Sequence, residues 1–426
     1  MDQRVDFKWN PLADQPHNVA SRRERLRRHW QNIGHYLALF PPNLKCSGPI
    51  IKRYFTYRSR LYRQSLKMEG LWGVAVSPLV NPLEETVTAL KELGVRRTLV
   101  RIPSWEREKL PQYQSYIRGL KQAGLEVMVA LLQNRFDVVE PARWRTFILE
   151  IREALPGLCR EVEIGHAWNR TKWGVWTHVE YLELARPAFA WLKERGFRPV
   201  GPAVIDFEFH LYPPVLQEID FNPVTSLLYV DRVGAPENRQ FGWNTSAKVA
   251  LLKAMIDAAT GKTRELWITE VNWPLAGTGP YSPAAGKPNV SEEDQASFLV
   301  RYFLLVGSSG LVSRVYWWQL VAPGYGLIDS RGGHWRKRPA FYALQTMIRC
   351  LEGSLFLGRV LRGDNYCFLF ETENGKLAVC WRKKGQKKIH FPFHLRQGFT
   401  CCGDKLVVNS SEMILGESPV FVYFED

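Results

Sequence analysis

The sequence predicts an α/β protein: a (β/α)8 TIM barrel with a small C-terminal β-domain and a basic N-terminal extension. Three observations lead to this prediction. Short apolar runs, typical of buried parallel strands, alternate with helical segments over about 280 residues. Helix signals stop after Gly353, where short strand-like runs and an Asn374-Gly375 hairpin signal follow. The first 67 residues hold fourteen Lys/Arg against four Asp/Glu, which is +10 of the net charge of +15.

Three domains are expected: an extension over 1–69, the barrel over 70–352 and the β-domain over 353–426. Leu26, Trp30, Ile33 and Leu37 recur at roughly helical spacing in the extension, with arginines between the first of them. Such an arm suits an anionic membrane surface through residues 1–67, or a solvated extension packed on the barrel. Nucleic acid is not expected as a partner, because no nucleic-acid-binding motif accompanies the charge. Gly48-Pro49 and the Arg/Tyr-rich run 54–62 predict a connector.

The composition favours a cytoplasmic protein. The N-terminus has no apolar signal segment, and no apolar run approaches the 18 or more residues of a membrane span. Seven scattered cysteines, without a CxxC pattern, indicate reduced thiols rather than a disulfide framework. We therefore expect a cytoplasmic chain, peripheral on the inner face of the membrane if the basic arm binds lipid.

Eight strands are expected in the barrel. They are 71–76, 98–102, 127–132, 162–165, 200–207, 224–229, 266–269 and 315–318. The expected helices between and after them are 82–93, 113–123, 142–155, 178–196, 247–259, 291–305 and 340–351. Eight units at this length favour a closed barrel over an open doubly wound sheet. No glycine-rich phosphate fingerprint follows an early strand, so a nucleotide cofactor is not expected.

The segment 266–273 is the most informative stretch. It is a short apolar strand with Glu270 expected at its end, tryptophans on both sides, and a Pro/Gly-rich loop behind it. A charged group at the end of a buried strand is costly unless it has ion-pair or hydrogen-bond partners, or a functional role. A carboxylate among aromatic rings suits a sugar, whose apolar faces stack on indole while the acid acts at the anomeric carbon.

Polar and aromatic residues also stand at the ends of the other strands, where a barrel of this type has its active site. The candidates for substrate binding beside Glu270 are Arg101, Gln133, Asn134, Trp168, Asn169, Asp206, Glu208, Tyr229, Trp273, Trp317, Trp318 and Gln319, with His166 as a second catalytic candidate. Together they predict a sugar-sized cleft. No His, Asp or Glu cluster has the spacing of a metal site, and no cofactor is expected.

The segments 162–169, 226–229, 267–270 and 316–318 resemble those of clan A glycoside hydrolases, near the xylosidase- and iduronidase-like members of family 39. The resemblance covers about residues 70–350. It implies that Glu270 is the nucleophile of a retaining mechanism and that Arg101 keeps it ionised. It also implies that Tyr229 hydrogen-bonds Glu270 and that Trp317 or Trp318 floors the subsite beside the scissile bond.

One departure from the family pattern is serious. The clan ends its fourth strand in Gly-Asn-Glu, with Glu as the acid/base, whereas this chain has Gly165-His166-Ala167. Another group could supply the proton, and His166, Asp206 and Glu208 are the candidates. Alternatively, the substrate carries a good leaving group, or the site binds glycan without cutting it. The sequence thus leaves open two functions: a retaining glycosidase or transglycosidase acting on a polysaccharide or lipid-linked glycan, and a non-catalytic glycan-binding pseudoenzyme of polysaccharide or lipopolysaccharide assembly.

Overall fold

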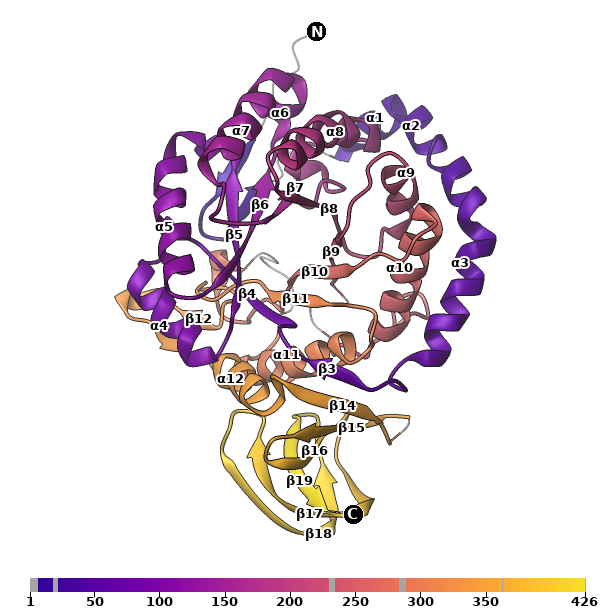
Figure 1. The fold of residues 1–426 in the computed structure, drawn as a ribbon, viewed down its shortest axis with the longest axis vertical. Helices are drawn as coiled ribbons and strands as arrows, with labels where there is room; N and C mark the ends of the chain where they lie inside the picture. Colours follow the sequence, from indigo (N-terminus) through magenta and orange to yellow (C-terminus); the bar gives the residue numbers. More distant parts are fainter. Residues whose placement is uncertain (1–6, 18–21, 230–233, 283–288, 362, 426) are drawn as a thin grey trace.

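The computed structural model describes residues 7–17, 22–229, 234–282, 289–361 and 363–425. Its centre is a closed barrel of eight parallel strands in the order β10-β11-β4-β5-β6-β7-β8-β9 (Figure 1). These strands are β4 (Trp72–Val76), β5 (Arg97–Pro103), β6 (Glu126–Leu132), β7 (Glu161–Ile164), β8 (Arg198–Ile205), β9 (Val224–Leu227), β10 (Leu266–Val271) and β11 (Arg314–Trp317). The predicted barrel is therefore confirmed.

Helices surround the barrel. They are α4 (Leu83–Leu93), α5 (Leu110–Gln122), α6 (Arg135–Val139), α7 (Pro141–Ala154), α8 (His178–Glu194), α9 (Tyr212–Leu216), α10 (Thr245–Thr260), α11 (Glu292–Gly307) and α12 (Pro339–Leu351). Several begin at a side-chain cap, as when Thr177 accepts the Glu180 N–H of α8 and Ser291 accepts the Asp294 N–H of α11. The short helices α6 and α9 were not expected from the sequence, because five residues are too few for a periodic pattern.

Side chains fill the interior of the barrel. Along β11, Val315 and Trp317 pack outward against the helices, whereas Tyr316 and Trp318 belong to the inner cluster. The two sets alternate because successive side chains of a strand point to opposite faces. Gly73 on β4 lies beside Tyr316, and a Cβ at that position would come within 2.4 Å of the ring. The glycine thus leaves room for the tyrosine inside the barrel.

A seven-stranded antiparallel sheet forms the C-terminal part, in the order β18-β17-β19-β16-β15-β14-β3. Its strands are β3 (Leu66–Met68), β14 (Ser354–Arg359), β15 (Asn365–Thr372), β16 (Gly375–Arg382), β17 (Lys387–Thr400), β18 (Lys405–Leu415) and β19 (Val420–Glu425). The predicted C-terminal β-domain is confirmed. Its edge strand β3 comes from residues N-terminal to the barrel, and it pairs with β14.

Residues 7–17 and 22–60 form a layer on the outside of the barrel. A hairpin of β1 (Lys8–Asn10) and β2 (Gln15–His17) precedes α1 (Arg22–Gln31), α2 (Ile33–Leu37) and α3 (Phe40–Arg60). Helix α3 packs along α10 and α9 on the outside of the barrel (Figure 1). The connector predicted at Gly48-Pro49 and 54–62 is wrong, since nearly all of it lies in α3. Tyr57 hydrogen-bonds Asp257 (2.5 Å) and Cys46 is buried, so contacts with the barrel stabilise the helix despite Pro49.

A short two-stranded ribbon completes the fold. The strands β12 (Ile328–Asp329) and β13 (Arg336–Lys337) form a separate ribbon between β11 and α12. All seven cysteines are free in the structure. Among the described helices, none combines the length and apolar content that crossing a bilayer requires.

A buried ion pair joins the barrel to the C-terminal sheet. Arg301 on α11 donates from Nε to Glu237 Oε1 (3.0 Å) and makes a second contact from Nη2 to Oε2. Trp381 on β16 donates to the same carboxylate (2.7 Å). Arg301 also donates to the Glu417 carbonyl (3.2 Å). Both ions are almost inaccessible to solvent, so each depends on the other for its compensation.

We expect Arg301→Met to lower the free energy of unfolding by about 3–5 kcal/mol, because it leaves the Glu237 carboxylate buried and unpaired. The measurement is denaturant unfolding followed by tryptophan fluorescence. The control is Arg186→Met, which removes the half-exposed pair with Glu218 and should cost less than about 1 kcal/mol. Equal losses in the two variants would contradict the role given to the buried pair.

Candidate active site

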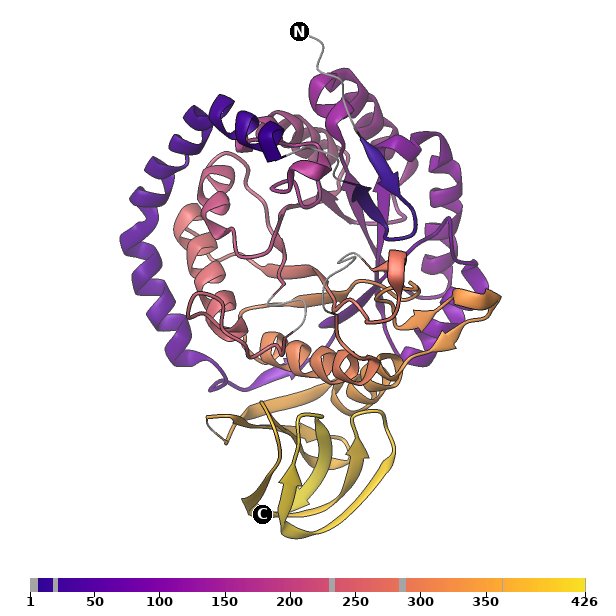
Figure 2. The same ribbon diagram turned by 180° about the vertical axis from the view of Figure 1, so that it is seen from behind.

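A cavity of about 140 Å³ lies at the C-terminal ends of the barrel strands. Its lining residues are Ala13, Asp14, Gln15, Arg101, His166, Arg170, Lys172, Trp173, Ile205, Tyr229, Glu270, Asn272, Trp318 and Tyr325. This volume is below the roughly 300–1,000 Å³ of most ligand pockets. Part of the wall comes from the β1–β2 hairpin, on the near side of the barrel in Figure 2.

Glu270 is held by groups from two other strand ends. It lies near the end of β10, and its side chain is 9% exposed. Arg101 on β5 forms an ion pair with its Oε2, and Tyr229, just after β9, donates a hydrogen bond to its Oε1 (2.5 Å). Each oxygen of the carboxylate thereby has a partner from another strand end. The predicted partners of Glu270 are thus brought together around it.

A register shift in β10 explains why Glu270 points inward. The pairing with β11 is regular up to Ile268 and resumes at Val271, and both of these residues pack in the outer core. The two residues between them, Thr269 and Glu270, both face the interior: Thr269 donates to Glu163 of β7, and Glu270 lines the cavity. A bulge re-aims a side chain in this way beside many active sites.

Of the three candidate tryptophans at or just after the ends of β10 and β11, Trp318 lines the cavity. The Arg101 guanidinium lies over its ring, 3.2 Å from the centroid. Trp273 and Trp317 are instead buried in the outer core and stack on each other with centroids 6.2 Å apart. Strand alternation separates Trp317 from Trp318.

His166 lies against Glu270 as a neutral imidazole. Its Nε2 is 3.5 Å from Glu270 Oε2, and its ring meets Trp173 edge-on at 4.6 Å. Burial, and then the Arg101 and Lys172 cations, hold the pKa of His166 well below its usual value. At neutral pH the ring therefore lacks the imidazolium proton that a role as general acid would require.

Gln133 and Asn134 support the loops of the site rather than line the cavity. The Gln133 side chain accepts the His166 N–H (2.9 Å) and donates to the His166 carbonyl (3.0 Å). Asn134 caps α6 in a reciprocal capping box with Asp137. Both side chains are buried. We infer that Gln133 positions the backbone that carries His166 and that Asn134 holds the start of α6.

Trp168 and Asn169 belong to a second cavity of about 290 Å³. Its lining residues are His29, His35, Tyr36, Leu39, Trp168, Asn169, Arg170, Thr171, Val175, Trp176, Thr177, His178, Glu208, His210 and Leu211. Trp168 stacks on Tyr181 at 4.6 Å, and Asn169 exchanges two hydrogen bonds with the Ile205 backbone. Arg170 lines both cavities, so the second adjoins the first.

The predicted acids of the fifth strand are engaged by the same arginine. Arg170 pairs with Asp206 (2.5 Å) and with Glu208. Glu208 lines the second cavity. Gln319, the last predicted binding residue, accepts from Ser77 (2.5 Å) and donates to Asp14 (3.2 Å). These contacts tie Asp206, Glu208 and Gln319 into the walls of the site.

Sequence reasoning missed Asp14 and Gln15, which reach the cavity from the N-terminal hairpin. Asn10-Pro11 is a turn signal, yet nothing in the sequence indicates that this turn docks on the barrel. Tyr325, from the loop after β11, was also missed. Asp231, a further polar residue expected at the end of the sixth strand, lies outside the described residues. Within the described residues, no group of three or more His, Cys, Asp or Glu is placed to hold a metal ion.

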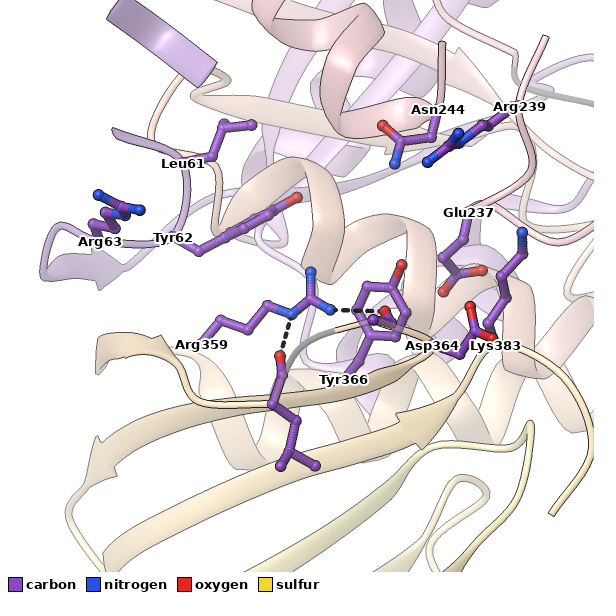
Figure 3. Close-up of a pocket in the computed structure, with 12 residues that line it drawn as sticks. Leu61, Tyr62, Arg63, Glu237, Arg239, Asn244, Arg359, Asp364, Tyr366 and Lys383 are labelled. Atoms are coloured by element: carbon purple, nitrogen blue, oxygen red, sulfur yellow. Dashed lines mark hydrogen bonds between the residues drawn. The ribbon is translucent and has the colours of Figure 1, made fainter. Parts of the chain in front are cut away.

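A larger pocket of about 400 Å³ lies between the barrel and the C-terminal sheet (Figure 3). Its cations include Arg359, which lies over the Tyr366 ring at 3.9 Å and donates to the Leu361 carbonyl. Its buried acid is Glu237, which is held by Arg301 and Trp381 as described above. Since these groups are engaged in the domain junction, we take the cavity around Glu270 as the candidate active site.

No protein-family model and no curated protein matches the chain in sequence. Solved structures do match it. A family 39 glycoside hydrolase from the gut symbiont Bacteroides cellulosilyticus WH2 has a TM-score of 0.64 at 15% identity, over 84% of this chain and 81% of its own. A family 30 endoxylanase from Clostridium papyrosolvens C71 has 0.57 at 12% identity, over 86% and 98%. A family 51 arabinofuranosidase from Xanthomonas axonopodis pv. citri has 0.56 at 12%, over 86% and 98%.

The similarity at these identities is one of fold. The resemblance to clan A glycoside hydrolases expected from the sequence is confirmed at that level, and it extends over the barrel and beyond it.

Glu163 is a second buried carboxyl, below Glu270 in the barrel. It is 1% exposed and accepts a hydrogen bond from Thr269 (2.7 Å). Burial raises the pKa of Glu163 to about 7, against the lowering effects of Thr225, Thr269 and Arg101. The folded protein therefore binds this proton more tightly than the unfolded chain does.

Glu163 accordingly stabilises the fold in acid, and this contribution is lost as the pH rises through about 7. Glu163→Gln keeps the shape without the charge, so it should raise stability relative to the wild type by up to about 3 kcal/mol at pH 8 and by much less at pH 5. Thermal unfolding of both proteins from pH 5 to pH 8 measures the difference. If the difference in stability between Glu163→Gln and the wild type is the same at every pH, Glu163 does not titrate in this range.

Proposed function

We propose that the chain is a retaining glycosidase or transglycosidase acting on the O-glycosyl bonds of a polysaccharide or lipid-linked glycan, with Glu270 as the nucleophile. The observation that carries the proposal is the arrangement of Arg101 and Tyr229 around Glu270 in one cavity. The cavity opens at the face of the barrel where TIM-barrel enzymes have their active sites. The shared fold of an endoxylanase and an arabinofuranosidase supports the same chemistry.

The groups around the cavity suit the steps of such a reaction. A Glu270 oxygen would attack the anomeric carbon and form a glycosyl-enzyme. Tyr229 and Arg101 orient that carboxylate, while Trp318 offers an aromatic face to the sugar ring. The adjoining cavity, with Trp168 and Trp176 among its aromatic residues, has room for a further sugar of a chain. A glycan rather than a single sugar is therefore the proposed substrate.

A second candidate function is non-catalytic glycan binding in polysaccharide or lipopolysaccharide assembly. Ala167 favours it, because a methyl group cannot donate the proton that an unactivated glycoside needs. The small volume of the cavity around Glu270 also favours it. The two functions differ in whether Glu270 forms a covalent bond to a sugar.

Activated 2-fluoro-glycosyl reagents test this difference, because their leaving group departs without a proton. We expect incubation with a panel of 2,4-dinitrophenyl 2-deoxy-2-fluoroglycosides to add the mass of one fluorosugar to the intact protein. Glu270→Gln should abolish the adduct, and peptide mapping should locate it on Glu270.

Glu163→Gln is the matched control, because it neutralises a second buried carboxyl of the same barrel that does not line the cavity. It should be labelled like the wild type. If no reagent labels the wild type while glycan fragments still bind to it, the non-catalytic function is the correct one.

The outer face of α2 and α3 supports a membrane-attached location. Leu37, Phe40, Leu44, Ile51 and Phe55 follow helical spacing, and each exposes between 59% and 68% of its surface. Five large apolar side chains along one helical stripe are unusual on a soluble surface. The opposite side of the same helices packs on the barrel and lines the second cavity through Tyr36 and Leu39.

Charge identifies the surface that this stripe fits. Between residues 25 and 68 the sequence has ten Lys/Arg and no Asp or Glu. Lys45, Lys52 and Arg58 are exposed on α3 beside the apolar stripe. An apolar stripe flanked by cations is typical of a helix that lies in the interface of an anionic bilayer. We propose peripheral attachment to the anionic, cytoplasmic leaflet, close to a lipid-linked glycan.

We expect the protein to co-sediment with vesicles containing phosphatidylserine at low salt and to lose binding as salt is raised. The double variant Ile51→Asp/Phe55→Asp should weaken binding at least about tenfold, since it removes apolar contact and adds repulsion. The control Val407→Asp changes an apolar residue on β18 that is even more exposed (87%), away from the stripe, and should bind like the wild type. Equal binding to uncharged phosphatidylcholine vesicles, or none at low salt, would contradict the proposal.

A further inference from the structure

The β1–β2 hairpin is docked on the mouth of the barrel by specific contacts (Figure 2). The Trp9 ring lies 5.1 Å from that of Trp105 and meets Trp173 edge-on at 6.1 Å. Lys172 donates to Gln15 Oε1 (2.5 Å). The hairpin is thus fixed on both sides of its turn, by aromatic packing from β1 and by a hydrogen bond from β2.

The turn of this hairpin directs Asp14 into the cavity. The Asn10 side chain accepts the backbone N–H groups of Leu12 (3.0 Å) and Ala13 (3.4 Å), which closes the turn. Asp14 then has a φ of +50°, a left-handed conformation that Asp and Asn tolerate better than most residues. As a result Ala13 is buried, Leu12 points to solvent, and Asp14 lines the same cavity as Glu270.

Asp14 and Glu270 share one guanidinium. Arg101 contacts Glu270 through Nη2 and lies 3.9 Å from Asp14 Oδ2 through Nη1. Among the described residues that line the cavity, these two carry the carboxyl groups. A retaining glycosidase uses a pair of carboxyl groups in one site, one ionised and one protonated.

The surroundings of Asp14 favour its protonated form. Burial raises the pKa of the Asp14 carboxyl, with Glu106 adding to the effect, while Arg101 and the Gln319 hydrogen bond oppose it. The other candidates for a proton donor are less suited. His166 is neutral, and Asp206 and Glu208 are ion-paired with Arg170.

We propose that Asp14 is the general acid/base of this site and replaces the carboxyl that Ala167 lacks. The inference rests on the proposed glycosidase function and concerns the same cavity. It assigns a catalytic role to a residue that lies outside the barrel, on a hairpin that the N-terminal extension contributes.

The reaction balances with these two groups. In the first step a Glu270 oxygen bonds to the anomeric carbon, the bond to the leaving oxygen breaks, and that oxygen takes its electron pair together with the Asp14 proton. In the second step the Asp14 carboxylate removes a proton from water, or from a sugar hydroxyl, whose oxygen attacks the anomeric carbon. The bond to Glu270 then breaks, which restores the Glu270 carboxylate and the protonated Asp14.

The test is the dependence of the rate on the leaving group. For the sugar that labels Glu270, aryl glycosides with phenyl and 2,4-dinitrophenyl leaving groups are compared in wild type and Asp14→Asn. Asparagine keeps the shape and the tolerance of a positive φ but has no proton to transfer. We expect kcat/KM to fall about 10²–10⁴-fold for the phenyl glycoside and less than about fivefold for the dinitrophenyl glycoside.

Leu12→Ala is the control in the same turn, because its exposed side chain does not line the cavity. It should leave both rates unchanged. Labelling of Asp14→Asn by the 2-fluoro reagent, at a rate close to that of the wild type, should show that Glu270 still works without Asp14.

The outcomes separate the two proposals. No labelling of the wild type would overturn the glycosidase function itself. If the wild type is labelled and Asp14→Asn lowers kcat/KM equally for the phenyl and dinitrophenyl glycosides, Asp14 has only a structural role in the turn. Faster labelling and faster turnover in Asp14→Asn would instead show that the hairpin blocks access to Glu270. Each of the last two results overturns the general acid assignment and leaves Glu270 as the nucleophile.

Discussion

The contact between Arg101 and Glu270 is the constraint on which the site depends. A carboxylate that is 9% exposed inside a barrel requires compensation, and Arg101 provides it from β5, three strands away from β10 in the barrel. The same guanidinium lies over Trp318 and reaches toward Asp14. One buried cation thus orients the nucleophile, an aromatic face and a second carboxyl. Few side chains other than arginine have the planar shape for three such contacts.

The walls of the site come from segments far apart in the sequence. Gln133 holds the loop of His166, Asn169 fixes the end of β8, and Gln319 reaches the N-terminal turn at Asp14. These amides carry no charge, and each of them has backbone or side-chain partners. Their role is to keep the loops at the barrel mouth in one arrangement. This is why several residues expected to bind substrate support the site from behind.

The N-terminal residues connect the two proposed properties of the molecule. The hairpin β1–β2 completes the cavity, α2 lines the adjoining one, and the outer stripe of α2 and α3 faces away from both. The basic extension is therefore a component of the proposed site rather than an appendage of the barrel.

The sequence by itself determined the barrel and the C-terminal sheet, because apolar periodicity indicates the strands and their order. It also placed Glu270, Arg101 and Tyr229 at the ends of strands, while their grouping around Glu270 was implied by the family resemblance. Three features were decided by the tertiary structure. The bulge that turns Glu270 inward depends on pairing with β11. The helical state of 40–60 depends on its packing against the barrel, which outweighs the local effect of Pro49. The position of Asp14 depends on contacts more than 80 residues away along the chain, and no local pattern encodes such a contact.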